Sequence, residues 1–166
     1  MSVTLDTVLD LIDALEQQLL TIDEDTVHDL LLEQMLNESL ERHGETTLWS
    51  AAGVLLLEVA LKVHDRAPGL ALALREMPMF GERDVDAAHA AAIKGTALVT
   101  GGDVRQRVTE LFATADRYRW DAYDLLMGAS MVANLLSDYE SPMPDAMDRG
   151  WAEAFVAELR AEARAA

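Results

Sequence analysis

Residues 49–63 read WSAAGVLLLEVALKV, an apolar run that holds one carboxylate, Glu58, and one cation, Lys62. At 100° per residue, apolar side chains cover most of the circumference of a helix here, while Glu58 and Lys62 share one narrow polar stripe. A helix that is apolar on nearly every side is surrounded by neighbours. We therefore predict a central helix over residues 46–64, with Glu58 exposed to solvent and ion-paired to Lys62 four residues later.

The rest of the chain carries helix signals and no strand signals. Apolar residues recur at intervals of three and four from Leu5 to Leu19, and Asp103 is a suitable N-cap. No segment alternates between polar and apolar residues with the period of a strand. The expected helices cover residues 5–19, 26–43, 46–64, 69–76, 83–99, 104–116 and 118–139, and an eighth follows the linker at 141–144. The sequence predicts an all-α fold, a single compact bundle of about seven or eight helices formed by residues 1–166 as one helical domain.

Two glycines inside predicted helices indicate which helices lie at the centre. Gly53 belongs to the apolar helix and Gly128 to the helix over 118–139. A glycine costs helix propensity, but it allows another backbone to approach closely. We expect these two helices to form the centre of the bundle.

Acidic residues outnumber basic residues by 30 to 13, which gives a net charge of −17 at pH 7. A field of that sign repels phosphate backbones and anionic lipid, so we expect no direct binding to nucleic acid and no membrane association. Two explanations of the acidity stay open. One is adaptation to a salt-rich cytoplasm, as in halophiles, and the other is a basic protein partner or mimicry of nucleic acid.

The N-terminal residues and the length of the apolar stretches predict a cytoplasmic protein, whereas the absence of cysteine leaves the redox compartment undetermined. Cysteine is absent, so the chain has neither a disulfide framework nor a thiolate metal site. The acids in the first ten residues, MSVTLDTVLD, disfavour an export signal. The longest apolar stretch, Leu48–Val63, contains Glu58 and is shorter than the roughly 20 residues that a membrane-spanning helix needs.

Two Asp-x-x-His pairs are the candidates for metal chemistry. Asp25 and His28 form one pair, Asp86 and His89 form the other, and Glu58 lies between them in sequence. Two-metal helical bundles use a related arrangement, with Glu in place of Asp. Acids are so frequent in this chain that such short pairs arise by chance, and a histidine on an apolar helix face is more often a core residue than a ligand. We expect no cofactor, and these five residues stay open as metal ligands.

Two aromatic segments are candidates for protein contacts. Arg117, Tyr118, Arg119 and Trp120 form the sequence RYRW, a combination of arginine and aromatic residues that is enriched in binding hot spots. The alternative is that these arginines pair internally with the many acids. In the last helix, Trp151 and Phe155 are four residues apart, and they either close the bundle or contact a second subunit.

The motifs that define common enzyme classes are absent from the sequence. The chain has no catalytic cysteine, no Gly-x-Ser-x-Gly elbow and no phosphate-binding loop. This favours a non-enzymatic soluble helical protein that acts through protein contacts, as an adaptor, a regulator or an assembly factor, with a protein partner or a second copy of itself. The alternatives are a bundle that binds a small apolar ligand and a metal-dependent enzyme that uses the Asp/His pairs.

Overall fold

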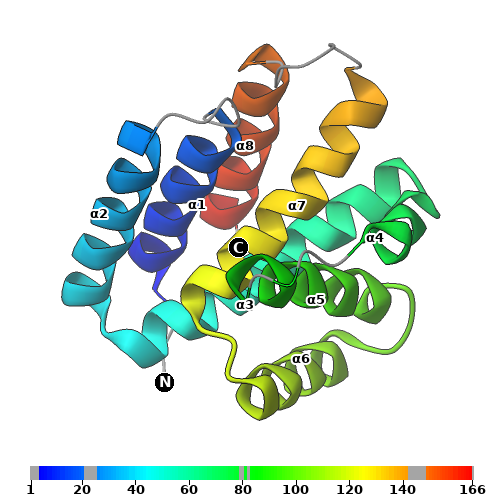
Figure 1. The fold of residues 1–166 in the computed structure, drawn as a ribbon, viewed down its shortest axis with the longest axis horizontal. Coiled ribbons are helices and arrows are strands. Elements are labelled where there is room, and N and C mark those ends of the chain that lie inside the picture. Colours follow the sequence, from blue (N-terminus) through cyan, green and yellow to red (C-terminus); the bar gives the residue numbers. More distant parts are fainter. Residues whose placement is uncertain (1–3, 21–25, 79–80, 82, 142–148, 166) are drawn as a thin grey trace.

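The longest described helix, α3 (Glu45–Arg66), crosses the middle of the molecule, as the apolar run predicted (Figure 1). The computed structural model describes residues 4–20, 26–78, 81, 83–141 and 149–165, and only the backbone at 26–29 and 83–84. The other elements are α1 (Leu5–Leu20), α2 (Thr26–His43), the 3-10 turn η1 (Leu70–Leu72), α4 (Ala73–Glu76), α5 (Arg83–Leu98), α6 (Val104–Tyr118), α7 (Ala122–Glu140) and α8 (Arg149–Ala165). These ranges contain no strand, so the predicted all-α bundle is confirmed.

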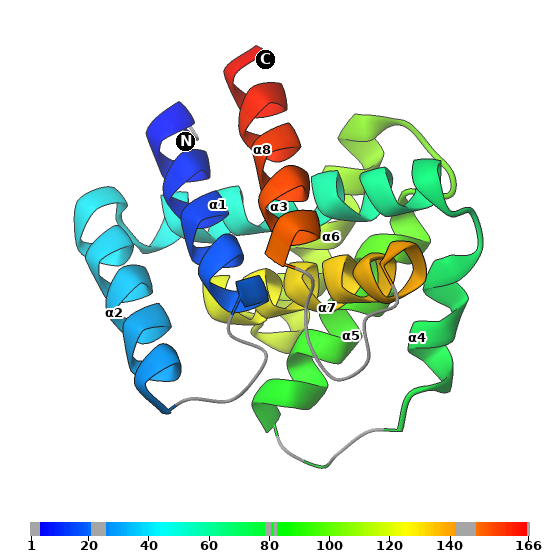
Figure 2. The same ribbon diagram turned by 90° about the horizontal axis from the view of Figure 1, so that it is seen from above.

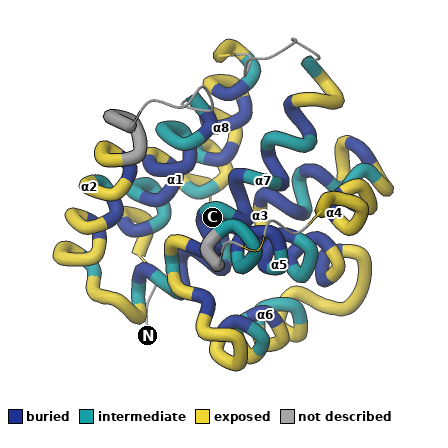
Figure 3. The backbone as a smooth tube through the Cα atoms, viewed as in Figure 1, coloured by how far each residue is buried: buried dark blue, intermediate teal, exposed yellow. Residues whose placement is uncertain are grey.

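Helices α3 and α7 form the centre of the bundle and contact each other more extensively than any other pair of described elements. Both are largely buried along their length, whereas α2 and α6 show long exposed stretches (Figure 3). The predicted central pair is therefore confirmed. The two glycines nevertheless serve other contacts. A Cβ atom at Gly128 would lie 3.1 Å from the Ala88 carbonyl oxygen of α5, and one at Gly53 would lie 2.5 Å from the Phe112 ring of α6.

The remaining helices cover the central pair from two sides. Helices α1, α2 and α8 lie side by side at one side, and α4, α5 and α6 lie at the other (Figures 1 and 2). The buried side chains of both groups join one hydrophobic cluster with the central pair, to which α1 contributes Leu11 and Leu15 and α8 contributes Phe155. Burial of this continuous apolar surface is the main force that stabilises the fold.

Glu58 is exposed, as predicted, and its neighbours Leu57 and Val59 are buried. The predicted ion pair with Lys62 is wrong. Lys62 Nζ lies 3.0 Å from Glu158 Oε2 and 2.6 Å from Glu162 Oε1, because α8 runs along this side of α3 and offers two carboxylates. Burial by itself would lower the pKa of Lys62, but its hydrogen bonds to these carboxylates and their charges outweigh burial and raise it.

The predicted helix over 69–76 is divided into η1 and α4. Gly69 has φ +86°, a left-handed conformation that favours glycine, and the chain turns there after α3 has ended. The two short elements follow directly, and Leu74 of α4 is buried. In this segment η1 contacts α3 and α7, and α4 contacts α5.

Candidate interaction site

The junction between α6 and α7 is a defined corner, not a continuous bend. Helix α6 extends to Tyr118, two residues beyond its predicted end, and Arg119 then takes a left-handed conformation with φ 57°. Helix α7 begins at Ala122, four residues after its predicted start, because Asp121 and Asp124 form a reciprocal capping box. These local bonds fix the direction in which the corner side chains leave the backbone.

Trp120 anchors the corner to the central helix. Its side chain is only 7% exposed, and its carbonyl oxygen accepts a 2.8 Å hydrogen bond from Trp49 Nε1 of α3. The Trp49 ring in turn packs on Phe112 of α6, with ring centroids 4.6 Å apart. The sequence reasoning grouped Trp120 with the interaction residues, and the structure places it under the surface as a support.

Tyr118 and the two arginines form the exposed part of the corner. The Tyr118 side chain is 60% exposed and stacks on Trp120, with centroids 5.8 Å apart and planes at 23°. The guanidinium carbon of Arg117 lies 5.6 Å from the centre of the Tyr118 ring, within range of a cation–π contact. Trp120 therefore holds Tyr118 from one side, while Arg117 and Arg119 extend into solvent beside it.

Neither Arg117 nor Arg119 makes an ion pair with a residue that the structure describes, so internal pairing is not observed for these two arginines. Elsewhere in the described chain, five lysine and arginine side chains pair with acids: Arg42, Lys62, Arg66, Lys94 and Arg160. Five other described arginines make no ion pair with a described residue: Arg75, Arg105, Arg107, Arg149 and Arg164. The corner thus presents two exposed arginines that make no ion pair with a described residue, with the exposed acids Asp116 and Asp121 near them in the chain.

A groove of about 710 Å³ opens beside the corner, and we call it the corner groove. It lies between the C-terminal half of α2, the first turns of α3, and the corner itself. Its polar lining residues are Arg119, the three acids Glu45, Asp116 and Asp121, and the uncharged Asn37 and Thr46. Apolar and aromatic residues make up the rest of the lining: Leu36, Leu40, Leu48, Trp49, Ala115, Trp120, Ala122 and Tyr123. A second hollow of about 480 Å³ shares Leu36, Asn37 and Tyr123 with it and continues along α2.

The sequence reasoning missed the contribution of α2 to this site. Leu40, which lines the corner groove, is 41% exposed, and Leu30 and Leu31 of the same helix, which line neither hollow, are 61% and 41% exposed. The available signal was that leucines occur on more than one face of α2, although a helix at the edge of a bundle buries only one stripe. The excess leucines mark apolar surface that the described fold leaves uncovered.

Trp151 and Phe155 connect α8 to the central pair. Phe155 is 1% exposed and stacks on Trp151, with centroids 4.8 Å apart. Trp151 Nε1 donates a 2.9 Å hydrogen bond to Glu140 Oε1 at the end of α7, and Arg66 of α3 binds both oxygens of the same carboxylate. This arrangement corresponds to closure of the bundle, and the buried Phe155 offers no surface to a second subunit.

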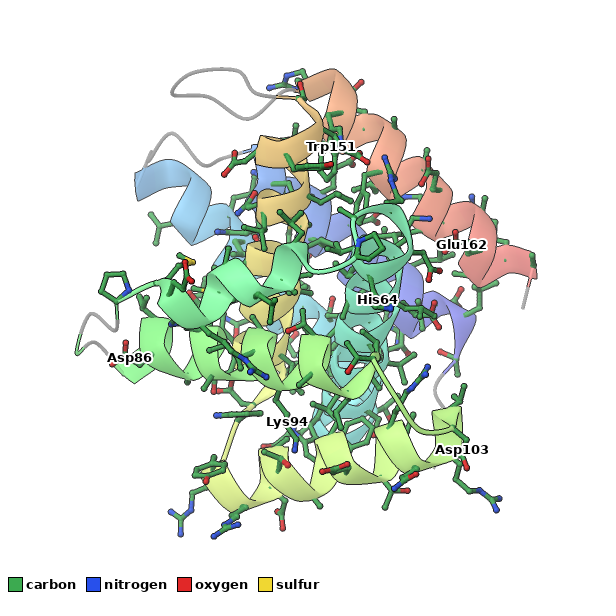
Figure 4. The ribbon with its side chains drawn as sticks, turned by 90° about the vertical axis from the view of Figure 1, so that its right-hand side faces the viewer. His64, Asp86, Lys94, Asp103, Trp151 and Glu162 are labelled. Atoms are coloured by element: carbon green, nitrogen blue, oxygen red, sulfur yellow. The ribbon has the colours of Figure 1, made fainter. Side chains whose placement is uncertain are left out.

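Among the described residues, the structure does not bring the proposed metal ligands Glu58, Asp86 and His89 together. Glu58 faces a notch between α1, α3 and α8, whereas the Nε2–H of buried His89 donates to the Leu74 carbonyl of α4. Asp86 on α5 lies far from Glu162, which borders the same notch as Glu58 (Figure 4). The residues described contain no group of three or more potential ligands, and Asp25 and the His28 side chain lie outside them.

By length and composition alone, α3 is apolar enough to cross a membrane, and 61% of its most apolar window is buried inside the fold. A core helix that neighbours cover on most sides has the same composition. The buried side chains of α3 belong to the hydrophobic cluster shared with α1, α7 and α8.

Comparison with known proteins does not assign this chain to a family. No protein-family model matches the chain, and neither the curated proteins nor the solved structures contain a significant match. The functional argument therefore depends on the residues of the site itself.

Proposed function

We propose that this protein is a non-enzymatic helical protein that acts through protein contacts, and that the corner groove with Tyr118, Arg117 and Arg119 is its binding surface. The observation that carries the proposal is the exposed Tyr118, held between Trp120 and Arg117, next to a groove that Trp120 and Arg119 help to line. An adaptor, a regulator or an assembly factor in the cytoplasm fits this surface.

The chemistry of the corner is that of a binding hot spot. Tyrosine, tryptophan and arginine are the residues most enriched among those that dominate binding energies, and they work best in a pocket that excludes water. Tyr118 is already positioned by its stack on Trp120, so less side-chain freedom is lost on binding. The two arginines add charge-assisted hydrogen bonds to carboxylates or carbonyl groups of a partner.

The net charge of −17 limits the kind of partner. Nucleic acid and anionic lipid are repelled at long range, and the two arginines of the corner, which have Asp116 and Asp121 beside them in the chain, do not offset that field. A protein that presents acidic or carbonyl groups to the corner and apolar side chains to the groove fits best, and a second copy of this chain belongs to this class.

The test compares two tyrosines of equal exposure. Tyr118 is 60% exposed and Tyr139 at the end of α7 is 62% exposed. We expect Tyr118→Ala to lose the bound protein, or the self-association seen by sedimentation velocity, while Tyr139→Ala retains it at wild-type level. Equal retention by both variants, with unchanged circular dichroism, would exclude the corner as the binding surface.

A further inference from the structure

A second site lies on the opposite group of helices, in a notch of about 280 Å³ between α1, α3 and α8. Its walls are aliphatic, and its polar residues include Glu58 of α3 and Glu162 of α8. The principal aliphatic wall residues are Leu5, Val8, Ile12, Val54, Leu55 and Leu159. Ile12, Leu55 and Leu159 are at most 3% exposed, so the floor of the notch is part of the hydrophobic core.

The two carboxylates of the notch are not equivalent. Glu162 Oε1 accepts a 2.6 Å hydrogen bond from Lys62 Nζ, which also pairs with Glu158. Glu58 makes neither a hydrogen bond nor an ion pair with any residue in the described part of the chain. Lys62 therefore pairs with Glu158 and Glu162, and Glu158 also pairs with Arg66, whereas Glu58 faces the notch without an ion pair to a described residue.

Electrostatics at Glu58 agree with this geometry. Partial burial against the aliphatic walls and the neighbouring charge of Glu162 raise its pKa, and Lys62 only partly opposes them. A cation placed in the notch would reverse this effect, because it would stabilise the charged form of the carboxylate.

We propose that the notch binds a small cation with an apolar body, such as a primary alkylamine, with its ammonium group on Glu58 and its alkyl chain along the aliphatic walls. We infer the positive charge of the ligand from the carboxylate of Glu58, which has no ion pair, and its apolar body from the aliphatic walls of the notch. The volume lies just below the range of about 300–1,000 Å³ for small-molecule sites, which limits the ligand to a short chain. This site is separate from the corner groove, so its failure would leave the proposed function unchanged.

The experiment titrates n-hexylamine, as its ammonium ion at pH 7, into ¹⁵N-labelled protein and follows amide shifts by NMR. We expect saturable shifts in α1, α3 and α8 around Leu5, Val54 and Ala163, and weaker binding of n-hexanol, which has the same shape without the charge. Glu58→Gln keeps the side-chain size and should weaken amine binding about fivefold, the upper value for a solvent-accessible ion pair.

Two further variants make the result decisive. Glu153→Gln removes an equal charge from an exposed position of α8 and should bind the amine as the wild type does. Ala163→Leu should fill the notch while leaving Glu58 in place, and abolish binding. No saturable binding by the wild type, equal binding of hexanol and hexylamine, or unchanged binding by Glu58→Gln would each overturn the proposal.

Discussion

The surface between α3 and α8 and the corner between α6 and α7 both combine cations with aromatic rings, but they use them differently. At α8, Lys62 and Arg66 lie 6.0 and 5.9 Å from the buried Phe155 ring and also pair with acids of α7 and α8. At the corner, Arg117 lies over an exposed tyrosine and has no acidic partner among the described residues. The same residue types therefore stabilise the fold in one place and present a surface in the other.

The largest expected difference between the two regions is in stability. Phe155→Ala should lower the free energy of unfolding by about 3–5 kcal/mol, because it leaves a cavity beneath Trp151. Tyr118→Ala should cost less than about 1 kcal/mol, since its ring is mainly in solvent. Urea unfolding followed by circular dichroism measures both. A similar loss in the two variants would remove the distinction between closure of the bundle and a free surface.

The next largest expected difference is between the contributions of Arg66 and Arg117 to the free energy of unfolding. Arg66→Gln breaks the two-oxygen contact with Glu140 and the pair with Glu158, and should cost about 1 kcal/mol after solvent screening. Arg117→Gln should change stability by less than about 0.5 kcal/mol, because it breaks no ion pair among the described residues. For a chain of this size, 1 kcal/mol corresponds to a shift of about 2–4 °C in Tm. Destabilisation by Arg117→Gln that matches Arg66→Gln would reveal a structural role for the corner.

The pH dependence of stability tests whether the ion pairs between α3, α7 and α8 stabilise the fold. Burial alone would raise the pKa of Glu140, but hydrogen bonds from Trp151 and Arg66 and the charge of Arg66 outweigh burial and lower it. A lowered carboxyl pKa contributes stability above the unfolded-state pKa, near 4.3, and this contribution is lost as pH falls through the folded-state pKa. Glu140→Gln should therefore be less stable than the wild type at pH 7, by at most about 1 kcal/mol. The difference should disappear once the pH has fallen below the lowered pKa of Glu140. A difference that persists at low pH would show that the carboxylate charge is not its source.

The smallest effect concerns the backbone of the corner. Arg119 has φ 57°, a conformation that glycine adopts without cost at the end of a helix. Arg119→Gly should leave stability unchanged or raise it by about 0.5 kcal/mol, while it removes one of the two free cations. A clear loss of stability would mean that the Arg119 side chain supports the corner, and thermal unfolding detects either result.

The sequence was sufficient for the helices and for the exposure of Glu58, because both follow from local periodicity. It was not sufficient for the partner of Lys62. An ion pair between residues four apart is worth only about 0.2–0.5 kcal/mol, so two carboxylates from another helix displace it easily. The identity of that helix depends on tertiary packing. The neighbours of Gly53 and Gly128 were unpredictable for the same reason.

The candidate site was predictable only in part. The RYRW segment identified the corner, but helical periodicity did not separate the buried Trp120 from the exposed Tyr118, because the left-handed Arg119 interrupts it between them. The groove combines residues 36–49 of α2 and α3 with residues 115–123 of α6 and α7, and these two segments are far apart in sequence. Surfaces of this kind arise when the helices pack together.

Site-specific photo-crosslinking tests the central claim most directly. The crosslinker benzoylphenylalanine is placed at three exposed positions, each on a different helix. Position 118 lies at the corner, position 40 lies in the groove, and position 139 is the control. We predict that the first two capture the same protein, or a second copy of this chain, at several times the yield of position 139. Equal yields at all three positions, or capture at position 139 alone, would contradict the assignment of the corner groove as the binding surface.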